Sequence, residues 1–432
     1  MPTRILYWNI RDFARNKISH PSVKKRKLGS SLNEAQAAED RCMHILWLVG
    51  QVAPQIIVVV ETETAFSERG TLALGQGGRG ARLLLNGIRE QTNNVAWRLV
   101  PPLQTGPNEA VSVFYDSTNR YFTGPFIWPG GWGTAQPGGV PGPYPDKHRA
   151  GLPNRTIPAA AQYNGTVSER HVAARTEFVE AAHTGNPGSA IDYDNHRAPY
   201  MTTFTETNNA NVVIRNLSLF SIHAPASFAA RQYLRDLADN AQIVDGMANN
   251  EVRVIVGDFN WNLLINTLTP SQSYQQLVNR GYTLVLSPPA VPPNPSLGYR
   301  GYFATHLART RDAVFWSTNG NPSYYPAYGY RSGTDYAIDN MFVRYGAGLN
   351  PPGNNNFTIM NPVVGTPYNF VPVPPGNAPI GSIALAQEMD TPPVIANPAQ
   401  AYSPGLMRSF RSWEKYGHIY SVSDHLSLAI DV

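Results

Sequence analysis

The chain has 432 residues, of which 42% are hydrophobic and 11% aromatic, so it can form a substantial core and is not a largely disordered protein. Its formal net charge is +4, because 34 basic residues nearly balance 30 acidic ones, and this allows a polyanionic partner without requiring one. The single cysteine, Cys42, excludes an internal disulfide and a metal site built from several cysteines.

The N-terminal segment does not have the pattern of a secretory signal. Arg11 and Asp12 interrupt the apolar run that such a signal needs. No apolar run approaches the roughly 18 residues of a membrane span. We therefore expect a protein that is cytoplasmic as made, without a membrane span. Export would need a route other than the general secretory pathway.

Hydrophobic patterning predicts alternating strands and helices in the first half of the chain. The helix at 34–50 is predicted from the spacing of Ala37, Met43, Leu46 and Trp47. The expected elements to the middle of the chain are strands at 4–10 and 55–60, helices at 34–50 and 81–91, and strands at 97–100, 110–115, 199–205 and 212–222.

The clearest helical pattern lies at 229–249, with Tyr233, Leu237, Ala241, Val244 and Met247 on one face. It leads into the apolar strand 252–256, which stops at a Gly-Asp-Phe-Asn sequence. The remaining expected elements are a short helix at 274–280 and strands at 283–286, 313–316, 338–344 and 426–430.

Three segments rich in proline or glycine interrupt this pattern, at 124–195, 287–335 and 346–415. Segments of this length are either binding loops or disordered insertions. The basic run KKRK at 24–27 is either part of a solvated loop, or a nuclear-import or phosphate-binding patch.

Polar residues recur where the apolar strands end. Carboxylates and amides without cysteine suit a hard cation such as Mg²⁺. Two histidines near carboxylates suit an acid and a base on either side of a reacting phosphate. Taken singly, each residue has an ordinary structural explanation, such as a turn, a cap or a surface histidine. The residues at strand ends are Asn9, Glu61, His223, Asp258, Asn260, Asp339, Asp424 and His425.

The order of these motifs resembles the endonuclease/exonuclease/phosphatase superfamily, and within it most closely deoxyribonuclease I and the nuclease subunit of cytolethal distending toxin. The resemblance implies an α/β (α+β) fold: a four-layer sandwich of two packed mixed β-sheets with outer helices. It also implies one catalytic domain over 1–432, with the three segments above as insertions. The motifs are WNI at 8–10, a strand ending in Glu61, SIHAP at 221–225, GDFN at 257–260, AID at 337–339 and SDH at 423–425.

The resemblance also implies roles for two histidine pairs. His425, oriented by Asp339, would take the proton from the attacking water. His223, supported by Glu109, would stabilise or protonate the leaving oxygen. The full set of catalytic residues implied is His223, His425, Asp258, Asn260, Asp339, Glu109 and Asp424.

The same resemblance implies a cation and a phosphate site. The cation would be Mg²⁺, with Mn²⁺ or Ca²⁺ as alternatives, and its ligands would be Glu61, Asn9 and Asp424. The substrate phosphate would be contacted by Arg197, Thr334 and Asn260.

Three departures from the family patterns bear on the substrate. Glu63 stands where deoxyribonuclease I has an arginine that enters the DNA minor groove, and Pro107 stands where it has a tyrosine that packs on the sugar. Both argue against ordinary binding in the minor groove of duplex DNA. The Trp-Cys-Asp-Arg element of the inositol phosphatases is absent at 336–339, which argues against that branch.

The sequence therefore predicts a Mg²⁺-dependent phosphodiesterase, most specifically an endonuclease that cleaves DNA. It would be either a toxin or effector, with an inhibitor (immunity) protein or a delivery apparatus as partner, or a cytoplasmic repair or scavenging enzyme. One alternative is a phospholipid phosphodiesterase of the sphingomyelinase kind or a phosphatase, with the aromatic segment Phe126–Trp132 at the membrane surface. Another is a binding module without catalytic activity.

Overall fold

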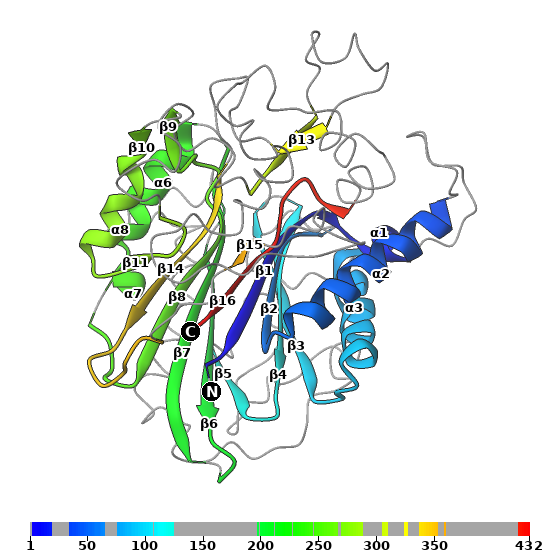
Figure 1. Ribbon diagram of the computed structural model, residues 1–432, viewed down its shortest axis with the longest axis horizontal. Coiled ribbons are helices and arrows are strands. Elements are labelled where there is room, and N and C mark those ends of the chain that lie inside the picture. Colours follow the sequence, from blue (N-terminus) through cyan, green and yellow to red (C-terminus); the bar gives the residue numbers. More distant parts are fainter. Residues whose placement is uncertain are drawn as a thin grey trace, which may run out of the picture.

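Two mixed β-sheets of six strands each form the centre of the computed structural model (Figure 1). The structure describes residues 2–19, 34–64, 76–106, 108–124, 197, 199–210, 212–226, 228–244, 246–266, 269–287, 305–309, 324–326, 337–352, 358–359 and 422–432. The predicted strand at 313–316, the basic run at 24–27, the segment 126–132 and most of the three insertions lie outside these residues.

The first sheet has the strand order β15-β16-β1-β2-β4-β3. Its neighbouring strands β1 and β2 are parallel, and its other pairs are antiparallel. The strands are β1 (Arg4–Phe13), β2 (Ile56–Glu63), β3 (Trp97–Gly106), β4 (Glu109–Asp116), β15 (Thr358–Ile359) and β16 (Leu428–Asp431).

The second sheet has the order β11-β14-β8-β7-β6-β5, with β7 and β8 parallel and the other pairs antiparallel. Two short hairpins, β9–β10 and β12–β13, lie outside both sheets. The strands are β5 (Arg120–Gly124), β6 (Tyr200–Thr207), β7 (Val213–His223), β8 (Glu251–Asp258), β9 (Leu264–Asn266), β10 (Thr269–Pro270), β11 (Thr283–Leu284), β12 (Leu307–Arg309), β13 (Tyr324–Pro326) and β14 (Asp339–Tyr345).

Helices cover the outer face of each sheet (Figure 1), which confirms the predicted four-layer α/β sandwich. One group lies against the first sheet and the other against the second, on opposite sides of the molecule. The first group is α1 (Arg15–Ile18), α2 (Glu34–Val52) and α3 (Gln76–Thr92); the second is α6 (Phe228–Asp239), α7 (Ala241–Val244), the 3-10 turn η2 (Gln272–Tyr274) and α8 (Gln275–Asn279).

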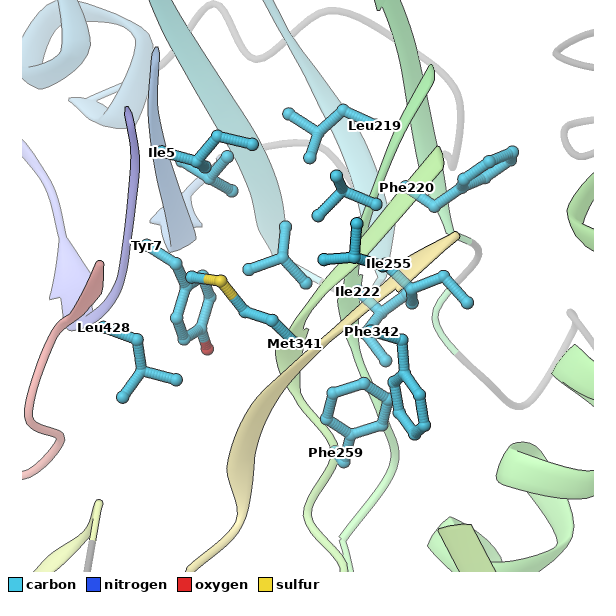
Figure 2. Packing of buried hydrophobic residues seen from close by; sticks show 14 of the residues in the cluster. Ile5, Tyr7, Leu219, Phe220, Ile222, Ile255, Phe259, Met341, Phe342 and Leu428 are labelled. Atoms are coloured by element: carbon cyan, nitrogen blue, oxygen red, sulfur yellow. The ribbon is translucent and has the colours of Figure 1, made fainter. Parts of the chain in front are cut away.

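Alternation along β14 explains how one strand contributes apolar side chains to both faces of its sheet. Met341 points toward the first sheet, where Tyr7 lies, and Phe342 points to the other face (Figure 2). There Phe342 contacts the rings of Phe259 and Tyr274, at centroid distances of 5.5 and 6.0 Å. The second sheet is therefore buried on both faces, and this accounts for the nearly continuous apolar runs of its strands.

Most predicted strands are confirmed, but two details of the helices were wrong. The helix predicted over 229–249 ends at Asp239, and α7 is a separate single turn. Arg253 donates hydrogen bonds to the carbonyl oxygens of Ile243 and Gly246. These bonds fix the backbone of the segment over which the helix was expected to continue. In α2 the predicted face included Met43, which is 65% exposed, because the buried face is Ile45, Leu48, Val49 and Val52.

A buried ionic cluster joins the two sheets at the edge where β1 and β7 begin. Glu206 of β6 pairs with Arg120 of β5 at 3.0 Å and with Arg215 of β7. It also accepts a hydrogen bond from the Thr3 hydroxyl group, and Arg215 donates to the carbonyl oxygen of Val432 at 2.7 Å. Because Thr3 and Val432 lie beside the first sheet, this cluster holds the two sheets together.

In the described part of the chain, no helix combines the length and apolar character that crossing a membrane would require.

Candidate active site

The register of the second sheet brings three of the predicted polar strand ends into one row. His223 ends β7 and pairs in register with Asp258, which ends β8, and Asp258 pairs in turn with Asp339 at the start of β14. To form this row, β7 and β8 must approach each other closely at the residues that immediately precede it. A Cβ atom on Gly257 would lie 2.1 Å from the carbonyl oxygen of Ile222, so only glycine fits there.

The first sheet contributes Asn9 and Glu61. Asn9 lies opposite Val60 on the parallel pair β1–β2, and Glu61 follows at a register shift with a φ of +58°. The Asn9 amide group donates hydrogen bonds to Glu61 at 3.0 Å and to Asp258 at 3.2 Å. Because Asp258 belongs to the second sheet, Asn9 connects the two sheets at the site. The Asp12 N–H fixes the second Glu61 oxygen at 3.2 Å.

His223 is held by a carboxylate of the opposite sheet. Its Nδ1 atom lies 2.8 Å from Glu109 of β4, and Glu109 also pairs with Arg197. Its Nε2 atom faces inward, 3.5 Å from Asp258 and 3.7 Å from Glu61. Burial, helped by the positive charge of Arg197, lowers the pKa of His223 in spite of these carboxylates. The imidazole is therefore neutral at neutral pH.

His425 forms the second pair. Its Nδ1 atom lies 2.8 Å from Asp339, and its Nε2 atom lies 3.7 Å from Asp258. The other Asp339 oxygen accepts a hydrogen bond from the Tyr7 hydroxyl group at 2.9 Å. Burial alone would lower the pKa of His425, but the charges of Asp339 and Asp258 outweigh burial and raise it to about 10. In the cation-free protein this histidine is protonated at neutral pH.

Asp258 and Asn260 are fixed by backbone contacts. The Asn260 N–H donates to Asp258 at 2.7 Å, and the Asn260 side-chain amide donates to the carbonyl oxygen of Ala224 at 2.8 Å. Arg197 donates to the same Ala224 oxygen at 3.1 Å, so Asn260 and Arg197 meet at the end of β7. Burial and the neighbouring Asp339 raise the pKa of Asp258, although both histidines oppose this rise.

The segment 423–425 is attached to β1. The Ser423 hydroxyl group accepts the N–H of His425 at 2.9 Å and donates to the carbonyl oxygen of Asn9 at 2.5 Å. The Trp8 indole donates to the carbonyl oxygen of His425 at 2.9 Å. These contacts explain how residues more than 400 positions apart in the sequence come to share one site.

Asp424 lies on the outer side of His425. It pairs with Arg11 at 3.0 Å, and His306 lies 3.8 Å away. Burial would raise the pKa of Asp424, but His306, His425 and Arg11 together lower it far below its ordinary value. The carboxylate is therefore ionised throughout the physiological range.

The residues near Glu61 fit a hard divalent cation. The Glu61 side chain is 23% exposed, so it can be reached from solvent. The Asn9 side-chain oxygen is buried and accepts no hydrogen bond from any residue that the structure describes. A buried carbonyl oxygen of this kind beside a carboxylate is a donor set that Mg²⁺, Mn²⁺ and Ca²⁺ accept.

The structure brings together most of the predicted site residues, and Thr334 lies outside the described residues. Asp424, predicted as a cation ligand with Glu61 and Asn9, groups with His306 and His425 in the structure. Sequence reasoning missed four contacts of the site. Tyr7 could have been found, because it precedes Asn9 by two and points to the same face of the strand. The Thr305 hydroxyl group accepts hydrogen bonds from the N–H groups of Ile338 and Asp339. No sequence pattern pointed to this residue, because it lies in a proline-rich segment. The missed residues are Tyr7, Thr305, His306 and Ser423.

Comparison with known proteins finds similarity only among solved structures. No protein-family model matches the chain, and no curated protein sequence matches it. An endonuclease/exonuclease/phosphatase family protein from Leptotrichia buccalis has 9% identity and a TM-score of 0.40, and the match covers 99% of this chain and 98% of that one.

Two further similar structures come from vertebrates. D. rerio TDP2, complexed with a single-strand DNA product, has 9% identity and a TM-score of 0.39 over 99% of this chain and 97% of that one. The human Nocturnin catalytic domain, with a bound sulfate anion, has 10% identity and a TM-score of 0.36 over 100% and 93%. Similarity at this level says nothing about the substrate of the present chain.

Proposed function

We propose that this protein is a divalent-cation-dependent phosphodiesterase and that its substrate is DNA, which it cleaves as an endonuclease. The observation that carries the proposal is the pair of buried histidine–carboxylate contacts, His223–Glu109 and His425–Asp339. The two Nε2 atoms lie 3.5 and 3.7 Å from the same Asp258 carboxylate. Two imidazoles directed at one small space suit proton transfer on both sides of a phosphate.

Glu61 and Asn9 would hold the cation, Mg²⁺ in the first instance, which when bound neutralises charge that develops on the phosphate. The Asp258 carboxylate, held by Asn9 and Asn260, faces the same space. The amide group of Asn260 and the guanidinium group of Arg197, which meet at the end of β7, would position the phosphate oxygens.

His425 would accept the proton of the attacking water. Asp339 directs the Nδ1–H of this imidazole toward itself, so that Nε2 is left as the acceptor. The carboxylates around His425 hold it protonated until part of their negative charge is offset. A cation held by Glu61 and Asn9 would offset part of this negative charge and so favour the neutral imidazole that can accept a proton.

His223 would stabilise or protonate the leaving oxygen. This role needs a proton on Nε2 as well as on Nδ1, and the nearby carboxylates of Asp258 and Glu61 favour that charged form against burial and Arg197. Glu109 holds the Nδ1–H of His223, and Arg197 holds Glu109 from the other side. Residues of both sheets are thus needed for each histidine, since Glu109 belongs to the first sheet and His223 to the second. Acid–base assistance of this type typically accelerates a reaction by roughly 10²- to 10⁴-fold.

Nicking of supercoiled plasmid in Mg²⁺, blocked by EDTA, tests the proposal. His223→Ala and His425→Ala should lose nearly all nicking, whereas Asp239→Asn, at an exposed carboxylate paired with Arg280, should keep it. Release of phosphocholine from sphingomyelin vesicles with intact plasmid would instead indicate a phospholipid phosphodiesterase. Inactivity on both substrates would indicate a binding module and refute the proposal.

A further inference from the structure

A third histidine, His306, lies against the catalytic pair and has no part in the proposed reaction. Its ring meets the His425 ring edge to face, with a centroid distance of 4.7 Å and an interplanar angle of 76°. The backbones of the two residues form an isolated β-bridge, and the side chain of His306 is 23% exposed. His306 therefore lies between solvent and the buried His425.

Asp424 completes a group of three possible metal ligands. Its two oxygens lie 3.8 Å from His306 Nε2 and 4.0 Å from His425 Nε2. One ligand atom from each of the three residues lies within 4.8 Å of the other two. Ligands of a tetrahedral Zn²⁺ ion lie about 3.4 Å apart, because each bond is about 2.1 Å long. The ligand atoms lie at most 4.8 Å apart, so a shortening of roughly 0.4 to 1.4 Å per pair would close the group around an ion.

Two further features support a metal site here. Asp339 holds the Nδ1 atom of His425, which is the carboxylate contact that metal-bound histidines usually have. One Asp424 oxygen is buried and accepts no hydrogen bond among the described residues. Two imidazoles and one carboxylate favour Zn²⁺ and similar transition metals over Mg²⁺, which prefers oxygen ligands.

The other two groups of possible ligands differ from this one. In the group of Asp258, Asp339 and His425 all members are buried, and both oxygens of Asp339 already accept hydrogen bonds. The group of Glu61, His223 and Asp258 lies at the predicted Mg²⁺ site. The group with His306 has two half-buried members and is the most exposed of the three. It shares His425 with the first of these groups, and its Asp424 is the residue that the sequence also predicts as a Mg²⁺ ligand, so only His306 is new to the site.

We propose that His306, Asp424 and His425 form a second cation site, which binds Zn²⁺ or a similar transition-metal ion, and that its occupation stops catalysis. Binding would engage Nε2 of His425, the atom assigned to accept the proton of water, so inhibition rests on the proposed function while binding does not. Arg11 competes for the site, because its guanidinium group neutralises Asp424 at 3.0 Å. The Arg11 side chain is 46% exposed and can leave without disturbing the core.

Titration of the full-length protein with Co²⁺ in excess Mg²⁺ tests binding without any activity measurement. Wild-type protein should develop the visible absorption of tetrahedral Co²⁺, and Zn²⁺ should abolish it. His306→Ala and His306→Gln should weaken binding about tenfold or more, while Arg11→Ala should strengthen it. Circular dichroism confirms that each variant is folded. Equal binding by wild-type protein and both His306 variants would overturn the proposal.

Plasmid nicking then tests inhibition. Zn²⁺ should inhibit the wild-type protein in the presence of Mg²⁺, and His306→Ala should need at least about ten times more Zn²⁺ for the same inhibition. Equal Zn²⁺ sensitivity of the two proteins would refute inhibition through this site. If Co²⁺ binding depends on His306 but no phosphodiester is cleaved, the metal site stands and the proposed function fails.

Discussion

Replacing Asp339 by asparagine tests the assignment of His425 most directly. The substitution removes one negative charge and keeps an oxygen that can accept the Tyr7 hydroxyl hydrogen bond, at a position that is fully buried. It also places an amide group beside Nδ1 of His425, where it can favour the wrong tautomer. The fold should therefore persist while the histidine loses its orientation.

The size of the effect follows from the electrostatics of His425. A pKa raised from 6.5 to about 10 corresponds to roughly 5 kcal/mol in favour of the imidazolium ion. Asp339 is the strongest of the charges that raise it, ahead of Asp258. Removing it takes away the main stabilisation of the proton that His425 would receive, so kcat for plasmid nicking should fall by roughly 10²- to 10⁴-fold.

Two measurements check this expectation. Histidine NMR of the cation-free protein should show His425 titrating near pH 10 in the wild type and at a clearly lower pH in Asp339→Asn, because the variant stabilises the charged form less. Nicking kinetics at saturating Mg²⁺ give the change in kcat, with Asp239→Asn as the matched control. A variant with kcat within threefold of wild type and an unchanged His425 titration would refute the assignment.

Three more predictions concern single residues elsewhere in the structure. Glu109→Gln should lower kcat for plasmid nicking by roughly 10²-fold or more, because His223 loses the carboxylate that orients its Nδ1 atom. A variant that nicks at the wild-type rate would show that catalysis does not need this contact. Burial would raise the pKa of Glu206, but its two arginine partners outweigh burial and lower it, so its stabilising charge is complete above about pH 4.5 and is lost as pH falls further. Glu206→Gln should accordingly reduce the free energy of unfolding at pH 7 by roughly 3–5 kcal/mol, with a smaller loss at pH 3; equal losses in urea titrations at both pH values would contradict this. Gly257→Ala should destabilise the protein by roughly 1–3 kcal/mol or more, because its Cβ atom would meet the Ile222 carbonyl oxygen, and an unchanged urea midpoint would show that the strands can separate there.

The sequence was most informative where a strand and its polar end are continuous. Asp258 was found because four apolar residues run directly into Gly257, and the register of β7, β8 and β14 then places His223 and Asp339 beside it. Strand alternation, not residue type alone, decides which polar groups meet, and alternation is visible in the sequence.

The misses have physical causes of two kinds. The helix at 229–249 was overextended because hydrophobic spacing continues past Asp239, whereas α6 ends there and Arg253 binds the backbone of the following segment at Ile243 and Gly246. Thr305 and His306 reach the site only because a two-residue pairing with 425–426 fixes their backbone. Such a long-range contact has no periodic trace in the sequence.

Two contacts of the site join side chains of opposite sheets, and their geometry therefore depends on how the two sheets pack on each other. Glu109 approaches His223 across the interface, and Tyr7 approaches Asp339 across it. A misplacement of about 1 Å can cost a catalytic site roughly 10²-fold in rate. The rate of hydrolysis would therefore report small shifts of one sheet relative to the other. The cavity left by Met341→Ala should slow nicking at denaturant concentrations where circular dichroism still shows a folded chain.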